Sequence, residues 1–134
     1  MKMQKVLVVD DQEANLEFLD HQLKRAGWQV ILASNGKEAL EKTEMHRPHV
    51  IVLDIVMPEM DGFQVARFIK ENPDYQNIRI IAATSLTSAA DRHRCFAAGC
   101  DDYIAKPFTV QQLQQRLALL LVSNSSTPWT ERRT

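Results

Sequence analysis

The stretch VLVVDD, residues 6–11, places four apolar residues directly before two adjacent carboxylates. The pattern recurs in VIVLD at 50–54 and, with a hydroxyl at its end, in IIAAT at 80–84. A shorter run, YIAKP at 103–107, leads into a lysine and a proline. Apolar runs of this length predict strands that are buried on both faces of a parallel sheet. Because chemistry gathers at the carboxyl ends of such strands, we expect these polar side chains to meet at one edge.

Helical periodicity and capping patterns occupy the intervals between the strands. The expected elements, in chain order, are a helix over 16–26 that stops at Gly27, a strand over 28–33, a helix from the Asn35 cap to His46, a helix after Asp61, a loop at 72–74, a strand over 79–83, a helix over 88–98 that stops at Gly99, a strand over 101–105 and a helix after Thr109. This alternation predicts an α/β fold, flavodoxin-like and doubly wound as (βα)5, with a five-stranded parallel sheet in the order 2-1-3-4-5. Residues 1–122 are expected to form one domain, and the polar segment 123–134 a disordered tail.

Two of the expected helices have unusual surfaces. The helix over 88–98 is polar at 91–94 and presents mostly alanine and cysteine on its apolar side, so we expect it to be weakly packed and mobile. The apolar run LLLV at 119–122 exceeds one helical face. Covering a sheet edge is the favoured interpretation of this run, and a partner or dimer surface is the alternative.

The composition favours a protein without nucleic-acid or membrane partners. The 134 residues include 16 basic and 17 acidic side chains, with no basic stripe. No apolar run approaches the roughly 20 residues that cross a bilayer, and no signal peptide is visible before the first strand. We therefore expect a cytoplasmic location.

The cysteines and histidines show no metal-binding pattern. Cys95 and Cys100 match no zinc or redox spacing and are expected to be small buried residues. The four histidines also lack ligand spacing, and we expect surface or boundary positions for His21, His46, His49 and His93.

The expected cluster of polar side chains has a definite chemistry. Three carboxylates, from Asp10, Asp11 and Asp54, repel one another unless a cation lies between them. Mg²⁺ suits such a set because it binds few carboxylates and keeps several waters. An aspartate can also attack phosphorus to form an acyl phosphate, whose oxygens Lys106 and Thr84 would neutralise.

Four motifs make the chain resemble the receiver domains of two-component response regulators over residues 4–122. They are VLVVDD at 6–11, DIVMPEMDG at 54–62, ATS at 83–85 and DDYIAKPF at 101–108. The resemblance implies a response-regulator receiver of the stand-alone type, similar to the chemotaxis response regulator. Such a protein is not a turnover enzyme, since it catalyses only its own phosphorylation and dephosphorylation.

The resemblance also implies roles for individual residues. Asp54 would accept a phosphoryl group from a sensor histidine kinase or a histidine phosphotransfer protein. Asp11, Asp54 and the backbone carbonyl of Val56 would hold Mg²⁺, with Asp10 acting through water. Lys106 would pair with the phosphoryl oxygens, and its bond to Pro107 is expected to be cis.

Thr84 and Tyr103 match the switch pair of the family. Their movement would reshape the face made by the fourth helix, the fifth strand and the fifth helix, to which an unknown downstream protein or a second copy of the chain would bind. Two apolar residues, Val56 and Leu86, occupy positions that influence water access to the phosphoaspartate in this family. They lead us to expect a comparatively long-lived phosphorylated form.

The residues present do not support two other functional classes. A haloacid-dehalogenase-like phosphohydrolase needs a second aspartate at the position of Val56. A flavodoxin-like FMN-binding protein needs a Gly/Ser/Thr-rich phosphate loop where this chain has acidic residues at 10–13. The remaining alternatives are a receiver-like interaction module that no longer cycles and a receiver fragment of a longer regulator.

Overall fold

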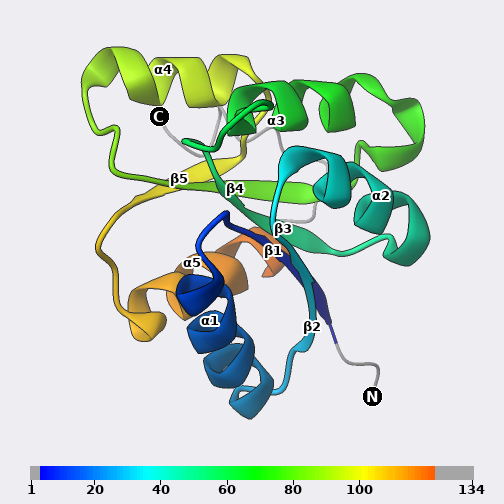
Figure 1. Ribbon diagram of the computed structural model, residues 1–134, viewed down its shortest axis with the longest axis vertical. Helices are drawn as coiled ribbons and strands as arrows, with labels where there is room; N and C mark the ends of the chain where they lie inside the picture. Colours follow the sequence, from blue (N-terminus) through cyan, green and yellow to red (C-terminus); the bar gives the residue numbers. More distant parts are fainter. Residues whose placement is uncertain (1–3, 123–134) are drawn as a thin grey trace.

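The computed structural model describes residues 4–122 as a sheet of five strands with helices on both sides (Figure 1). The elements in order are β1 (Lys5–Val9), α1 (Glu13–Arg25), β2 (Gln29–Ala33), α2 (Gly36–His46), β3 (Val50–Asp54), α3 (Gly62–Glu71), the short 3₁₀ helix η1 (Pro73–Tyr75), β4 (Arg79–Thr84), α4 (Ala89–Ala97), β5 (Asp102–Ala105) and α5 (Val110–Val122). The predicted tail, 123–134, lies outside the described residues.

All neighbouring strands are parallel, and their spatial order is β2-β1-β3-β4-β5. The predicted flavodoxin-like, doubly wound fold is therefore confirmed. The register aligns Val9 of β1 with Leu53 of β3, and Asp54 of β3 with Ala83 of β4. As a result, the polar residues that follow these strands reach the same edge of the sheet.

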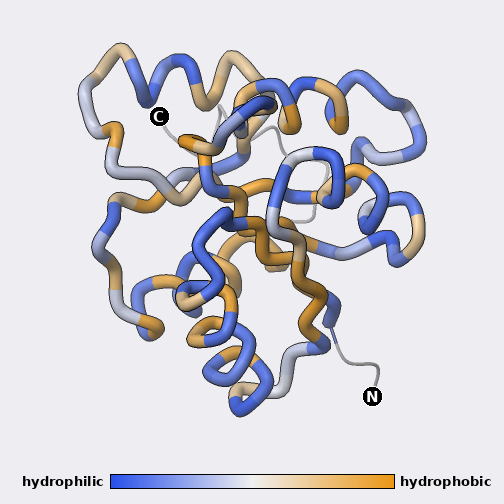
Figure 2. Tube along the Cα trace, viewed as in Figure 1, coloured by the Kyte–Doolittle hydropathy of each residue, from blue (hydrophilic) through white to orange (hydrophobic). Residues whose placement is uncertain are grey.

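Alternating residues of each strand face two separate hydrophobic layers. Leu7 and Val9 belong to the layer under α2, α3 and α4, whereas Val6 and Val8 belong to the layer under α1 and α5. Figure 1 shows these two groups of helices on opposite faces of the sheet, and Figure 2 shows the hydrophobic strands between them. A strand that is apolar at every position is required by this two-sided burial.

The helix ends follow the capping signals in the sequence. The Asn35 side chain accepts a hydrogen bond from the backbone N–H of Glu38 at 2.8 Å, and Asp61 forms a reciprocal capping box with Gln64. Gly27, with φ 99°, follows the end of α1 in a conformation that only glycine adopts readily. The predicted histidine positions are also confirmed, since all four are exposed or half-buried.

Two details differ from the simplest interpretation of the sequence. The expected loop at 72–74 contains η1, because Pro73 starts a helical turn and the Asn72 side chain caps it. The apolar end of α5 divides, with Leu120 buried while Leu119 is 61% and Val122 82% exposed. Within residues 4–122, no helix is long and apolar enough to cross a membrane.

Gly62 allows the start of α3 to lie directly against the end of β3. Its N–H donates to the Ile55 carbonyl at 2.8 Å, and a Cβ at this position would lie 2.5 Å from the Asp54 carbonyl oxygen. We expect Gly62→Ala to lower the free energy of unfolding by roughly 2–3 kcal/mol, because the backbone must shift. Urea denaturation of the purified protein measures this loss.

The matched control is Gly27→Ala, which adds the same methyl group where nothing lies within 4 Å of it. This variant carries only the cost of a positive φ, about 1 kcal/mol. Equal losses in the two variants would contradict the close packing at Gly62.

Candidate functional site

The predicted polar residues meet at the carboxyl edge of the sheet. Asp10 directly follows β1, Asp54 ends β3, Thr84 ends β4 and Lys106 directly follows β5. Because these four strands are adjacent and parallel, side chains that are far apart in the chain become neighbours.

The three carboxylates form a compact group. One oxygen each from Asp10, Asp11 and Asp54 lies within 4.8 Å of the others. Asp10 and Asp54 are buried, with 4% and 5% of their surfaces exposed, whereas Asp11 is exposed. This arrangement combines a buried floor with one carboxylate that reaches solvent, and it suits a hard divalent cation that keeps part of its water shell.

Asp10 also orders the chain that leaves β1. Its Oδ1 accepts a hydrogen bond from the backbone N–H of Gln12 at 2.8 Å, and its Oδ2 accepts one from the Asn15 side chain at 3.2 Å. Asp10 therefore forms the kind of side-chain turn that an aspartate commonly forms after a strand, and it also belongs to the acidic cluster. Asn15 was not identified from the sequence as a neighbour of the cluster. The only indication of this contact in the sequence is the position of Asn15 in the first turn of the helix that follows Asp10.

Lys106 supplies the positive charge of the cluster. Its Nζ lies 3.3 Å from Asp54 Oδ1 and 3.4 Å from Asp10 Oδ2, so one ammonium contacts both buried carboxylates. The Lys106 backbone N–H donates to the Thr84 carbonyl at 2.9 Å, which fixes the lysine beyond the end of β5. The peptide bond between Lys106 and Pro107 is cis.

Burial controls the protonation of Asp54. Desolvation raises its pKa from the ordinary 3.8 to about 6, against the attraction of Lys106, which lowers it, and with a further increase from the charge of Asp10. A hydrogen bond from the Val56 N–H to Asp54 Oδ1, at 3.3 Å, also favours the charged form. The carboxylate is therefore ionised at neutral pH but is poorly solvated.

The two residues of the predicted switch pair lie on β4 and β5. Thr84 is buried, and its hydroxyl oxygen accepts a hydrogen bond from the Leu86 N–H at 2.9 Å. Tyr103 is half-buried, and the Arg92 guanidinium lies 5.9 Å from the centre of its ring. Val56 is 55% exposed and Leu86 is half-buried.

A hollow of about 450 Å³ opens next to the cluster. Its lining includes the charged residues Asp10 and Lys106 together with four apolar residues, namely Phe18, Leu19, Pro107 and Phe108. Phe18 is 55% exposed although it is a large apolar residue. The hollow thus joins the charged groups to an apolar surface of α1, which the motif pattern did not indicate.

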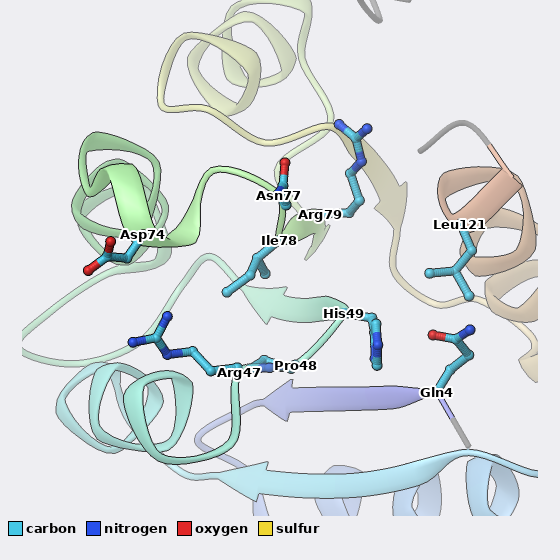
Figure 3. A pocket seen from close by; sticks show the side chains of 9 residues that line it. All are labelled: Gln4, Arg47, Pro48, His49, Asp74, Asn77, Ile78, Arg79 and Leu121. Carbon is cyan, nitrogen blue, oxygen red and sulfur yellow. The ribbon is translucent and has the colours of Figure 1, made fainter. Parts of the chain in front are cut away.

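A separate hollow of about 360 Å³ lies at the opposite, amino edge of the sheet (Figure 3). Figure 3 shows the guanidinium groups of Arg47 and Arg79 pointing in different directions, and the lining contains Asp74 as well. Arg79 pairs with Asp101 at 3.5 Å, and Arg47 lies 4.7 Å from the centre of the Tyr75 ring. These groups do not converge on a common ligand, so the carboxyl edge is the candidate site.

Comparison with known proteins identifies a single family. The profile of the response regulator receiver domain matches residues 6–118. Among solved structures, the chemotaxis protein CheY4 of Vibrio cholerae has a TM-score of 0.85 at 33% identity, covering 89% of this chain and 99% of that one. The receiver domain of a histidine kinase from Syntrophus aciditrophicus has a TM-score of 0.83 at 34% identity, covering 93% and 95%.

Curated relatives include both longer and shorter proteins. The alkaline phosphatase synthesis transcriptional regulatory protein PhoP of Bacillus subtilis is 36% identical over 128 residues, which are 95% of this chain and 52% of PhoP. The polar-differentiation response regulator DivK of Brucella anthropi is 34% identical over 105 residues, which are 78% of this chain and 85% of DivK. The chain spans about half the length of the first curated relatives it matches.

The raised pKa of Asp54 predicts a pH-dependent effect of Asp54→Asn on stability. The ionised form is penalised in the folded state, so the free energy of unfolding of the wild type falls as pH rises from the ordinary pKa of 3.8 through about 6. The Asp54→Asn variant does not lose stability in this pH range, because its side chain has no charge to be buried. We expect it to be more stable than the wild type by about 1–2 kcal/mol at pH 8, after allowance for partial solvation, and equally stable near pH 4.

Urea denaturation in a chelating buffer at both pH values measures the two differences. Asp74→Asn, which removes an exposed carboxylate from η1, serves as the control for the loss of one charge. A wild type that matches the Asp54→Asn variant in stability at pH 8 would show that burial does not penalise the Asp54 charge.

Proposed function

The chain belongs to the response regulator receiver domain family, and we propose that it transfers a phosphoryl group from a partner's phosphohistidine to Asp54 in a Mg²⁺-dependent step. The family implies phosphorylation at an aspartate in two-component signalling, and its members are not turnover enzymes. The observation that carries the choice of Asp54 is its position at the end of β3, the middle strand of the sheet, where it is buried and its Oδ1 lies 3.3 Å from Lys106 Nζ.

Transfer requires an ionised carboxylate. An Asp54 oxygen would attack phosphorus while the bond between phosphorus and the imidazole nitrogen breaks, and the partner's histidine would leave as the neutral ring. With its pKa at about 6, Asp54 is charged at neutral pH and has lost part of the hydration that would weaken a nucleophile. Lys106 lies close enough to Asp54 for its ammonium to contact and partly neutralise the phosphoryl oxygens as they approach.

The acidic cluster fits the metal that this chemistry requires. We assign Asp11, Asp54 and the Val56 backbone carbonyl as ligands of Mg²⁺, with Asp10 acting through water. The donor set is all oxygen, and the exposed Asp11 leaves room for water ligands. When bound, Mg²⁺ supplies positive charge for the phosphoryl oxygens and offsets the repulsion among the three carboxylates.

The signal would leave the site through Thr84 and Tyr103. The Thr84 hydroxyl accepts one hydrogen bond, from Leu86, and its own proton is available for a phosphoryl oxygen. A rotation of Tyr103 would break its contact with Arg92 and so change the surface formed by α4, β5 and α5. This surface would then bind a downstream protein or a second copy of the chain.

The phosphodonor would be a sensor histidine kinase or a histidine phosphotransfer protein. The hollow beside Lys106 supports this choice, since its apolar wall next to a reactive carboxylate suits a protein helix that carries a histidine. We propose output by protein contact, because the 16 basic and 17 acidic residues are nearly balanced and form no basic stripe in the sequence that would suit nucleic acid.

Phosphorylation at Asp54 is tested by intact mass after incubation with Mg²⁺ and acetyl phosphate. We expect one phosphoryl group on the wild type, none on Asp54→Asn, and none on the wild type when a chelator is present. Asp74→Asn serves as the matched control and should be phosphorylated like the wild type. A wild type that binds Mg²⁺ but gains no mass would instead favour an interaction module that no longer cycles.

Val56 and Leu86 predict slow hydrolysis of the phosphoaspartate. Two apolar side chains disfavour a water positioned for attack on phosphorus, and Val56 is exposed beside Asp54. We expect Val56→Asn to shorten the phosphoryl lifetime by about threefold, which is below 1 kcal/mol in barrier, while Val56→Leu leaves it near the wild-type value. Loss of the added mass over time in excess Mg²⁺ gives both rates, and an unchanged lifetime in Val56→Asn would contradict the assignment.

A further inference from the structure

The two cysteines of the chain meet at the end of α4, outside the acidic cluster. Gly99, with φ 108°, ends the helix, and its N–H donates to the Phe96 carbonyl at 3.0 Å. The Cys100 N–H donates to the Cys95 carbonyl, also at 3.0 Å. This pair of bonds is a Schellman motif, in which the side chains corresponding to Cys95 and Cys100 face each other.

The structure therefore brings the two cysteines close together, which their spacing of five residues in the sequence did not indicate. Both side chains are buried, with 1% of their surfaces exposed, as expected from the sequence. Both side chains belong to the hydrophobic layer under α2, α3 and α4. The hydrogen bond from Cys100 and the nearby Arg94 lower the pKa of the Cys95 thiol, while the same hydrogen bond and burial raise that of Cys100.

We propose that Cys95 and Cys100 form a reversible oxidation site, which a hydroperoxide such as hydrogen peroxide converts to an intrachain disulfide. The proposal stands on the Schellman geometry that brings Cys95 and Cys100 together at the end of α4, on their burial in one hydrophobic layer and on the weak packing of α4. It concerns thiol chemistry alone and is independent of the function proposed for Asp54.

The reaction balances with the peroxide as oxidant. The Cys95 thiolate attacks one peroxide oxygen, the O–O bond breaks, and a sulfenic acid and hydroxide form. The Cys100 thiol then attacks the sulfenic sulfur, the S–O bond breaks and water leaves. Overall, two thiols lose two electrons and two protons, and hydrogen peroxide becomes two waters. A dithiol reductant reverses the change by exchange.

Access to the buried sulfurs requires α4 to loosen at its end. Cys95 is the only buried residue of α4, so opening this helix exposes little other apolar surface. The remaining described contacts of the helix include the Arg94 guanidinium over the Phe63 ring, at 4.1 Å, and Arg92 near Tyr103. Contacts of this kind at a surface are weak and permit local opening of the helix.

A crosslink between these residues would fasten the last turn of α4 to the chain that enters β5. Cys100 lies next to Asp101, which pairs with Lys70 at 3.1 Å and accepts a hydrogen bond from the Ile80 N–H at 2.8 Å. The disulfide would thus connect α4, which is weakly packed, to Cys100, whose neighbour Asp101 is held by Lys70 and by the Ile80 N–H. Oxidation should slow the opening of α4 while leaving the acidic cluster unchanged.

The experiment treats the reduced, folded protein with hydrogen peroxide and follows intact mass, free thiols and mobility on a non-reducing gel. We expect a loss of about 2 Da with disappearance of both thiols in the monomer, and full recovery with dithiothreitol. Amide hydrogen exchange in α4 should become several-fold slower in the oxidised protein. Peptide mapping should identify one bridge between Cys95 and Cys100.

Cys95→Ser and Cys100→Ser are the matched controls, since each retains one thiol and cannot form the intrachain bridge. They should gain oxygen or form dimers instead, and they should still accept a phosphoryl group from acetyl phosphate if Asp54 is the acceptor. A urea-unfolded wild-type sample confirms that the peroxide is active. Folded wild type that keeps both thiols, or gains about 32 Da per cysteine without a bridge, would overturn the proposal.

Discussion

The contact of one ammonium with two buried carboxylates organises the carboxyl edge of this molecule. Lys106 reaches across the sheet to Asp10 and Asp54, 3.4 and 3.3 Å away, and brings together the ends of strands that are distant in sequence. A buried pair of like charges without this cation would be strongly unfavourable. Burial of Asp54 raises the pKa of its carboxyl against the opposing charge of Lys106, and the charge of Asp10 raises it further.

The features that the sequence predicts well are those that follow from local pattern. Four polar residues directly after apolar runs predicted both the parallel sheet and the edge at which they meet, since a buried strand must be apolar at every position. Glycine and capping residues marked the ends of helices for the same local reason, as Asn35 and Gly27 do. The pairing of Thr84 with the Lys106 backbone was implied only by strand order.

The features that the sequence did not predict depend on three-dimensional contacts. Asn15 binds Asp10 across a turn whose geometry no motif specifies. The contact of Cys95 with Cys100 needs the reversal of the chain at Gly99, which turns a spacing without known meaning into a close pair. The division of the apolar end of α5 into buried and exposed residues depends on where the sheet ends.

The weak packing of α4 affects how the surface of this helix can change in evolution. A helix that contributes a single buried side chain to the core can accept many substitutions without a large loss of folding stability. The acidic edge, in contrast, is fixed by buried charges that tolerate little replacement. The surface of α4 could therefore vary among relatives while the carboxyl edge around Asp54 stays constant.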